Sequence, residues 1–129
     1  MQMYPHGEIA LVVDCADLER AADFWCPVLG YRRAGEETST VYMSLFPENG
    51  HGPEILLQKV ADRSTAKNRV HLDLRTPDLA AEVQRVRDLG AVPATQEPIE
   101  EGGWRWHILT DPDDNEFCVL QPPASHWDE

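Results

Sequence analysis

Hydrophobic residues follow a strand-like spacing in some parts of this chain and a helix-like spacing in others. Residues 9–13 form an apolar run of the length of a buried strand. From Leu18 to Leu29 the apolar residues instead recur on one helical stripe. Asp17 precedes this stripe as a favoured N-cap residue, and Gly30 follows it as a common helix terminator. Further strands are predicted at residues 31–34, 41–46 and 54–60.

The same order of elements returns about 60 residues later, which indicates an internal repeat. A strand at residues 70–75 precedes Asp78, the predicted N-cap of a second helix that ends at Leu89. Residues 61–69 are predicted to link the repeats, and the acidic segment 95–103 is predicted to be a mobile loop. The remaining strands are predicted at residues 91–94, 104–109 and 116–121.

This repeat predicts an α+β fold with two βαβββ modules, at about residues 8–60 and 70–121, within a single domain spanning residues 1–129. Each module is expected to form a curved mixed sheet with a helix on one face. Two such sheets facing one another leave a concave space suited to a small molecule. A residue that occurs in only one repeat is therefore a candidate for function rather than architecture.

The composition argues against several classes of partner. The formal net charge is −12, from 23 acidic and 11 basic residues. Nucleic-acid and anionic membrane partners are therefore not expected, because both rely on clustered Lys and Arg. Three cysteines without a Cys-x-x-Cys motif do not resemble a disulfide framework, so we expect a cytoplasmic protein.

Several motifs together resemble the vicinal oxygen chelate superfamily, which includes glyoxalase I, extradiol dioxygenases, fosfomycin-resistance enzymes and bleomycin-binding proteins. The resemblance covers residues 8–122 and depends on the order and spacing of the motifs. They are the segment 70–74, the Asp-Leu helix starts, the Leu-Gly helix ends, Phe24-Trp25, and the segment from Trp104 through 111–118. It implies a glyoxalase-type fold with facing curved sheets, and a homodimer.

In metal-using members of that superfamily, the ligands come from the first and last strands of each module. The resemblance places these positions at His71 and Cys118 in the second module. In the first module it places them at Ala10 and at Leu57 or Gln58. The side chains of Ala10 and Leu57 cannot bind a metal, and Gln58 is a weak neutral ligand, so the predicted site, His71 with Cys118, is incomplete. The cofactor is left open as a divalent metal or none, and the incomplete ligand set favours none.

His71 is the principal catalytic candidate, because an imidazole can ligate a metal or act as a general base. The alternative is a histidine hydrogen-bonded to a neighbouring strand. Cys118 can serve as a thiolate ligand or as an activated nucleophile beside His71, although most such cysteines are small apolar core residues.

Ligand-binding candidates come from the other strands. Alternation puts Trp104 and Trp106 on one face of their strand and Arg105 and His107 on the other, without deciding which face meets a ligand. Tryptophans suit a flat apolar or cationic ligand, whereas Arg105 or His107 suits an anionic or polar group. Tyr42 and Gln58 are polar candidates of the first module, and Asp73, Arg75 and Glu54 are further strand-borne polar residues.

Two functions follow from these observations. The first is a small-molecule-binding protein of the bleomycin-resistance kind, without the full four-ligand metal site. The second is a metal-dependent lyase, isomerase or dioxygenase that uses His71 and Cys118. The sequence leaves open whether the protein is an enzyme.

Overall fold

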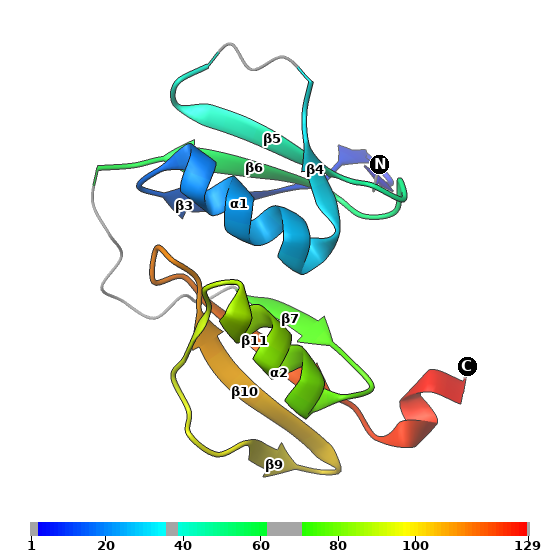
Figure 1. Cartoon of the computed structure of the whole chain (residues 1–129). Coiled ribbons are helices and arrows are strands. Elements are labelled where there is room, and N and C mark those ends of the chain that lie inside the picture. Colours follow the sequence, from blue (N-terminus) through cyan, green and yellow to red (C-terminus); the bar gives the residue numbers. More distant parts are fainter. Residues whose placement is uncertain (1–2, 36–38, 62–70, 129) are drawn as a thin grey trace. The chain divides into compact units, whose positions relative to one another are not determined.

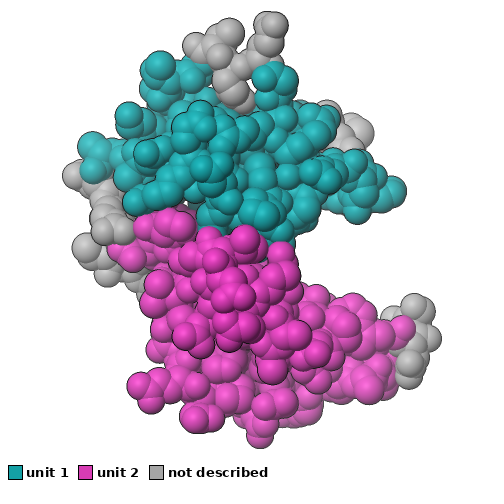
Figure 2. Space-filling view, viewed as in Figure 1, with its two compact units in different colours: residues 1–63 teal, residues 64–129 magenta. Residues whose placement is uncertain are grey.

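The computed structural model of this chain describes residues 3–35, 39–61 and 71–128. The chain divides into two compact units, residues 1–63 and 64–129, which are coloured separately in Figure 2. These units correspond to the two sequence repeats. Residues 62–69 of the predicted linker and Val70, the expected start of the second module, lie outside the described residues. That both modules make a single domain stays a prediction.

Unit 1 contains a four-stranded mixed sheet with the order β3-β6-β5-β4. Its first and last strands, β3 and β6, pair in parallel, and the remaining neighbours are antiparallel. A short antiparallel hairpin that the sequence pattern did not predict precedes this sheet. The elements are β1 (Met3–Tyr4), β2 (Gly7–Glu8), β3 (Ala10–Cys15), α1 (Leu18–Leu29), β4 (Tyr31–Arg33), β5 (Tyr42–Pro47) and β6 (Glu54–Lys59).

Unit 2 repeats this plan, with the strand order β7-β11-β10-β8 and a further strand, β9, pairing with β10. Its first and last strands, β7 and β11, are again parallel neighbours although far apart in sequence (Figure 1). The βαβββ prediction and the α+β class are therefore confirmed. The elements are β7 (Leu72–Arg75), α2 (Leu79–Asp88), β8 (Val92–Pro93), β9 (Ile99–Glu101), β10 (Trp104–Thr110), β11 (Glu116–Gln121) and the 3-10 helix η1 (Ala124–Asp128).

The prediction that residues 95–103 form a loop is wrong for β9. Gly102 and Gly103 have φ angles of 57° and 86°, which suit a tight hairpin turn that L-residues rarely adopt. This turn folds Glu100 and Glu101 back against β10, where they pair with Arg105 and Trp104. The acidic composition of residues 95–103 gave no indication of β9, which forms because Gly102 and Gly103 permit the tight turn.

Both helices begin as their sequences predict. The Asp17 carboxylate accepts a hydrogen bond from the Arg20 amide at 3.1 Å, and Asp78 does the same for Ala81 at 3.1 Å. These bonds satisfy amides that have no partner within the first turn. Gly30 ends α1 in a left-handed conformation, with φ 70°. Among the described residues, no helix combines the length and apolar character needed to cross a membrane.

Each helix covers one face of its own sheet, as Figure 1 shows. The apolar strand residues on that face are almost completely buried. They are Met43, Leu45, Ile55 and Leu57 in unit 1, and Leu109, Phe117 and Val119 in unit 2. Because alternate residues point to opposite faces, their sequence neighbours occupy the face turned away from the helix. We call this the distal face.

The turn between β10 and β11 is held by Asp111. Its Oδ1 accepts hydrogen bonds from the amides of Asp113 and Asn115, both at 2.8 Å, and its Oδ2 accepts one from the Asn115 side chain at 3.0 Å. Asp114 takes a positive φ of 66° in this turn. A left-handed Asp is tolerated better than most residues, because its side chain can bond locally. The turn therefore fixes how β11 returns beside β10.

Candidate functional site

The distal face of unit 2 collects most of the chemistry that the sequence singled out. The register pairs Cys118 on β11 with Asp73 on β7, and Cys118 also pairs with Ile108 on β10. Residues paired across neighbouring strands share one face of a sheet. The distal face therefore carries Asp73, Arg75, Cys118, Leu120, Trp104, Trp106 and Ile108, with His71 immediately before β7.

His71, Asp73 and Cys118 form the only group of at least three potential metal-binding side chains among the described residues. The His71 Nδ1 lies 3.1 Å from Asp73 Oδ1 and 4.0 Å from Cys118 Sγ. The side chains of His71 and Asp73 are 38% and 39% exposed, whereas Cys118 is buried. Ligand atoms from all three lie within 4.8 Å of one another.

Sequence reasoning placed His71 and Cys118 together and treated Asp73 only as a strand-borne polar residue. The missed signal was the spacing of Asp73 two residues after His71, which puts both side chains on one face of an extended segment. In this arrangement the imidazole can accept or deliver a proton beside a thiol and a carboxylate. Nitrogen, oxygen and sulfur donors together also form a ligand set suited to zinc-like ions.

Trp104 and Trp106 lie on the same distal face as this cluster. Both tryptophans are half-buried, and the Arg75 guanidinium lies 5.2 Å from the Trp104 ring centre. Such stacking is favourable because the ring face carries negative charge. The two rings and Arg75 thus add flat apolar area and one cation to the distal face that carries the cluster.

The C-terminal segment adds aromatic groups at Trp104. The His126 ring lies edge-on to Trp104 with centroids 5.6 Å apart, and Trp127 contacts His126 in the same manner at 5.0 Å. Trp127 remains 46% exposed. A Cβ added to Gly103 would lie 3.2 Å from the Pro123 side chain, so the hairpin turn and this segment are closely packed.

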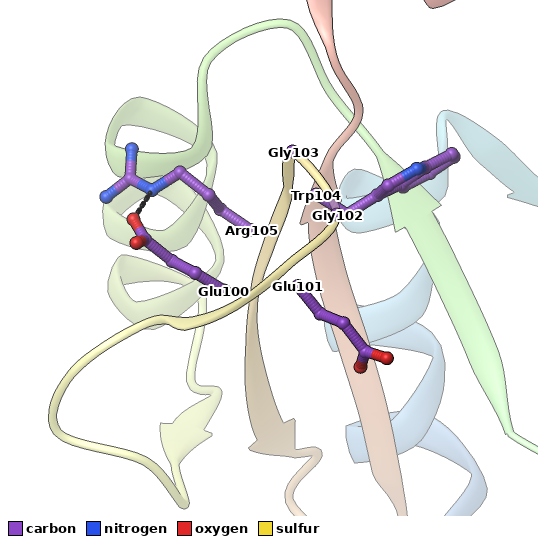
Figure 3. Close-up of a pocket in the computed structure, with 6 residues that line it drawn as sticks. All are labelled: Glu100, Glu101, Gly102, Gly103, Trp104 and Arg105. Atoms are coloured by element: carbon purple, nitrogen blue, oxygen red, sulfur yellow. Dashed lines mark ion pairs between the residues drawn. The ribbon is translucent and has the colours of Figure 1, made fainter.

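A shallow pocket lies at the β9–β10 turn, lined by Glu100, Glu101, Gly102, Gly103, Trp104 and Arg105 (Figure 3). The carboxylate of Glu100 forms an ion pair with Arg105 at 2.8 Å. Glu101 and Trp104 are paired across the hairpin, whereas Glu100 and Arg105 belong to the opposite face. The pocket thus sits at the strand end that carries Trp104.

Arg105 and His107 lie on the face of β10 that α2 covers, away from the His71 cluster. The Nδ1 of His107 contacts the Thr95 hydroxyl at 3.0 Å and the Thr95 carbonyl oxygen at 3.3 Å. The structure therefore separates the predicted ligand residues of this strand into two groups. Of these four residues, only Trp104 and Trp106 share the distal face with His71.

Tyr42 and Gln58 belong to unit 1, where they face each other across β5 and β6. Tyr42 is 44% exposed, and both side chains lie on the distal face of the unit 1 sheet. Ser44 on the same face donates a hydrogen bond to Glu54 at 2.7 Å. These residues form a polar patch within unit 1.

Comparison of the two registers identifies the unit 1 counterparts of the cluster. His71 and Asp73 correspond to Ala10 and Val12 by their positions before the helices. Val12 pairs with Leu56 as Asp73 pairs with Cys118, so the counterpart of Cys118 is Leu56. It is neither of the two predicted alternatives, and Leu57 lies on the helix-covered face. Unit 1 therefore has three apolar residues where unit 2 has the cluster.

Comparisons with known proteins agree with this architecture. Three solved structures illustrate the match. Their sequence identities to this chain are low, so they support a shared fold and nothing further. A glyoxalase/bleomycin resistance protein/dioxygenase family enzyme from Burkholderia phytofirmans is 16% identical, with a TM-score of 0.69 over 87% of this chain and 95% of that one. TnmS3, an antibiotic binding protein from Streptomyces, is 21% identical, with a TM-score of 0.67 over 94% and 99%.

The third structure is the fosfomycin resistance protein FosX from Mesorhizobium loti. It is 14% identical, with a TM-score of 0.68 over 95% of this chain and 98% of that one. No curated protein sequence matches this chain. The family model of the glyoxalase-like domain matches residues 10–120, which include both βαβββ units. The chain therefore belongs to the glyoxalase-like domain family.

Proposed function

We propose that this protein binds a small molecule on the distal face of unit 2. The observation that supports this most directly is the combination of Trp104 and Trp106 with His71, Asp73 and Cys118 on one sheet face. Small-molecule sites pair apolar and aromatic surface with a few polar groups that orient the ligand. This face supplies both, and the half-exposed imidazole and carboxylate are accessible to a ligand.

The kind of ligand is suggested by the proteins that share the fold. One is described as an antibiotic binding protein and another as a fosfomycin resistance protein. We therefore propose an antibiotic or similar secondary metabolite as the ligand. The surface formed by Trp104 and Trp106 favours a ligand with a flat apolar or cationic part.

We propose that ligand binding does not involve the full four-ligand metal site known from the superfamily. Ala10 and Leu56, which correspond to His71 and Cys118, carry no donor atom. A ligand site that depends on donors from both modules is thus not supported by these residues.

A metal-dependent lyase, isomerase or dioxygenase is the second candidate function. It is favoured by the approach of His71 Nδ1 to Cys118 Sγ, at 4.0 Å, on one face of the sheet. We further propose a homodimer, as the resemblance of the sequence motifs implies. We also propose a reducing cytoplasmic location, since the three cysteines all lie in the described part of the chain and none forms a disulfide.

Titration of tryptophan fluorescence with a panel of antibiotics, in buffer containing a chelator, tests the binding proposal. Binding to the distal face should change the emission saturably, and Trp106→Leu should weaken affinity about tenfold or more, since central aromatic contacts are worth over 1 kcal/mol. Arg105→Ala is the matched control, because Arg105 is the sequence neighbour of Trp106 and lies on the other face. An equal loss in both variants, or no saturable binding by any member of the panel, contradicts the proposal.

A further inference from the structure

The Arg75 side chain extends over the distal face of unit 2 and not away from it. Arg75 lies on β7 and Trp104 on β10, and β11 separates these two strands. The guanidinium nevertheless lies over the Trp104 ring, 5.2 Å from its centre. Since neighbouring strands are about 4.8 Å apart, the two side chains bridge about 10 Å and meet over β11. The positive charge therefore lies above the sheet and not beyond its edge.

The Trp104 ring holds the guanidinium in place and leaves its hydrogen-bond donors available. Trp104 is half-buried, and the His126 ring contacts it edge-on with centroids 5.6 Å apart. A guanidinium is planar, so it can stack on an aromatic ring while its N–H groups point outward within its own plane. Such a fork matches the two oxygens of a carboxylate or a similar anionic group. Arg75 is thus pre-organised to bind an anion.

Other arginines of this chain are neutralised within the protein, whereas Arg75 is not. Arg33, Arg85 and Arg105 each form an ion pair with an Asp or Glu side chain. No carboxylate of the described residues forms an ion pair with Arg75. Asp73 lies on the same face, but its carboxylate contacts the His71 Nδ1 at 3.1 Å. In a chain with 23 acidic and 11 basic residues, this fixed cation is available to an external anion.

Apolar side chains form a continuous row beside the guanidinium. Arg75 is paired with Leu120, Leu120 with Trp106, and Trp106 with Ile99. These four residues share one face of four neighbouring strands, so the row is about 14 Å long. Leu120 and Trp106 are half-buried, and Ile99 is 37% exposed. The row can therefore cover the flat body of a small molecule whose polar end meets Arg75.

We propose that Arg75 binds an anionic group of the ligand, while the ligand's aromatic body lies over Leu120, Trp106 and Ile99. The ligand class is thus an aromatic acid, with a carboxylate or sulfonate group. A cationic group is repelled at this position, because the guanidinium already lies over the Trp104 ring. The inference rests on the small-molecule binding proposed above and adds the charge of the ligand and the residue that selects it.

Two fluorescent probes that differ in charge test this assignment. Anilinonaphthalene sulfonate and phenylnaphthylamine share a flat aromatic body, and only the first carries an anionic group. We expect the sulfonate to bind saturably and more tightly than the neutral probe. Arg75→Gln should weaken sulfonate binding about tenfold, since a hydrogen bond to a charged group contributes enough free energy for such a change. The affinity for phenylnaphthylamine should not change in this variant.

Two further variants separate a specific role of Arg75 from an effect of net charge. Arg87→Gln removes the same charge from an exposed position on α2, which covers the other face of the sheet, and should leave both affinities unchanged. Arg75→Lys keeps the charge but lacks the planar fork. Its affinity for the sulfonate should lie between those of the wild type and Arg75→Gln.

Equal sulfonate affinity in the wild type and Arg75→Gln overturns the proposal, as does an equal loss for both probes or the same loss in Arg87→Gln. Absence of saturable sulfonate binding also overturns it. Saturable binding of phenylnaphthylamine that Trp106→Leu weakens, without any preference for the sulfonate, overturns the anionic site but leaves small-molecule binding on the distal face standing. Failure of this inference is therefore distinguishable from failure of the proposed function.

Discussion

Truncation of Leu56 and Leu57 to alanine tests the strand register from which the unit 1 counterparts of the site were assigned. Leu57 is 0% exposed on the helix-covered face, whereas Leu56 lies on the distal face and is half-buried. Removing a fully buried leucine side chain costs about 3 kcal/mol, because lost transfer free energy and a new cavity add together. At Leu56 the expected loss is about 1 kcal/mol, since part of the side chain already contacts solvent.

Urea denaturation followed by tryptophan fluorescence and far-ultraviolet circular dichroism measures both losses. Trp25 lies in the same core, so its emission reports unfolding of unit 1. With a denaturant dependence of about 1.5 kcal/mol per molar urea, Leu57→Ala should lower the midpoint by about 2 M and Leu56→Ala by about 0.7 M. In unit 2, Val119→Ala and Leu120→Ala should show the same order.

Equal losses in the unit 1 pair, or a larger loss for Leu56→Ala, would refute the reasoning. A strand shifted by one residue exchanges its two faces, so the pairing of Leu56 with Val12 would fail with it. The identification of Leu56 as the counterpart of Cys118 would then have to be abandoned.

Two further predictions concern unit 1. Burial raises the pKa of Tyr31, so the folded protein holds the phenolic proton more tightly than the unfolded chain does. The resulting contribution to the free energy of unfolding is fully present below the unfolded pKa of about 10, and it is lost as pH rises through the folded pKa. Urea unfolding at pH 8 and above pH 10 should show a smaller loss of stability in Tyr31→Phe, and identical pH profiles would contradict this. Ala10→His, Val12→Asp and Leu56→Cys together should place an imidazole, a carboxylate and a thiol on one face of unit 1 and so create a cobalt site with a thiolate-to-cobalt charge-transfer band. Leu57→Cys in place of Leu56→Cys should not add one, and equal success of both combinations would contradict the register.

The repeat and its elements could be predicted because each depends on local sequence. The caps Asp17 and Asp78 and the apolar stripes that follow them mark both helices without any knowledge of tertiary contacts. The strand β9 escaped prediction because its residues, Ile99 to Glu101, have a polar composition, and its pairing depends on the turn at Gly102 and Gly103. A composition argument treats such a segment as a solvated loop.

The candidate site could be predicted only in part, because it depends on the pairing of strands that lie far apart in the sequence. Alternation separated Trp106 from Arg105 but did not reveal which face the helix covers, since that depends on the packing of α2. The approach of Cys118 to His71 was expected from the order of strands in related folds. The spacing of Asp73 two residues after His71 puts both side chains on one face, but the position of Asp73 beside Cys118 follows only from the register of β7 against β11.

One physical explanation accounts both for the shared fold of the two units and for the polar distal-face residues that only unit 2 has. The helix-covered face of each sheet must remain apolar, because it forms the core of its unit, and Leu57 and Val119 are both 0% exposed there. The distal faces are under no such constraint, so they are free to diverge. Unit 1 has Val12 and Leu56 where unit 2 has Asp73 and Cys118. The two units therefore share apolar cores and differ on their distal faces, which is why the mismatch between the copies points to the candidate site more directly than either copy alone.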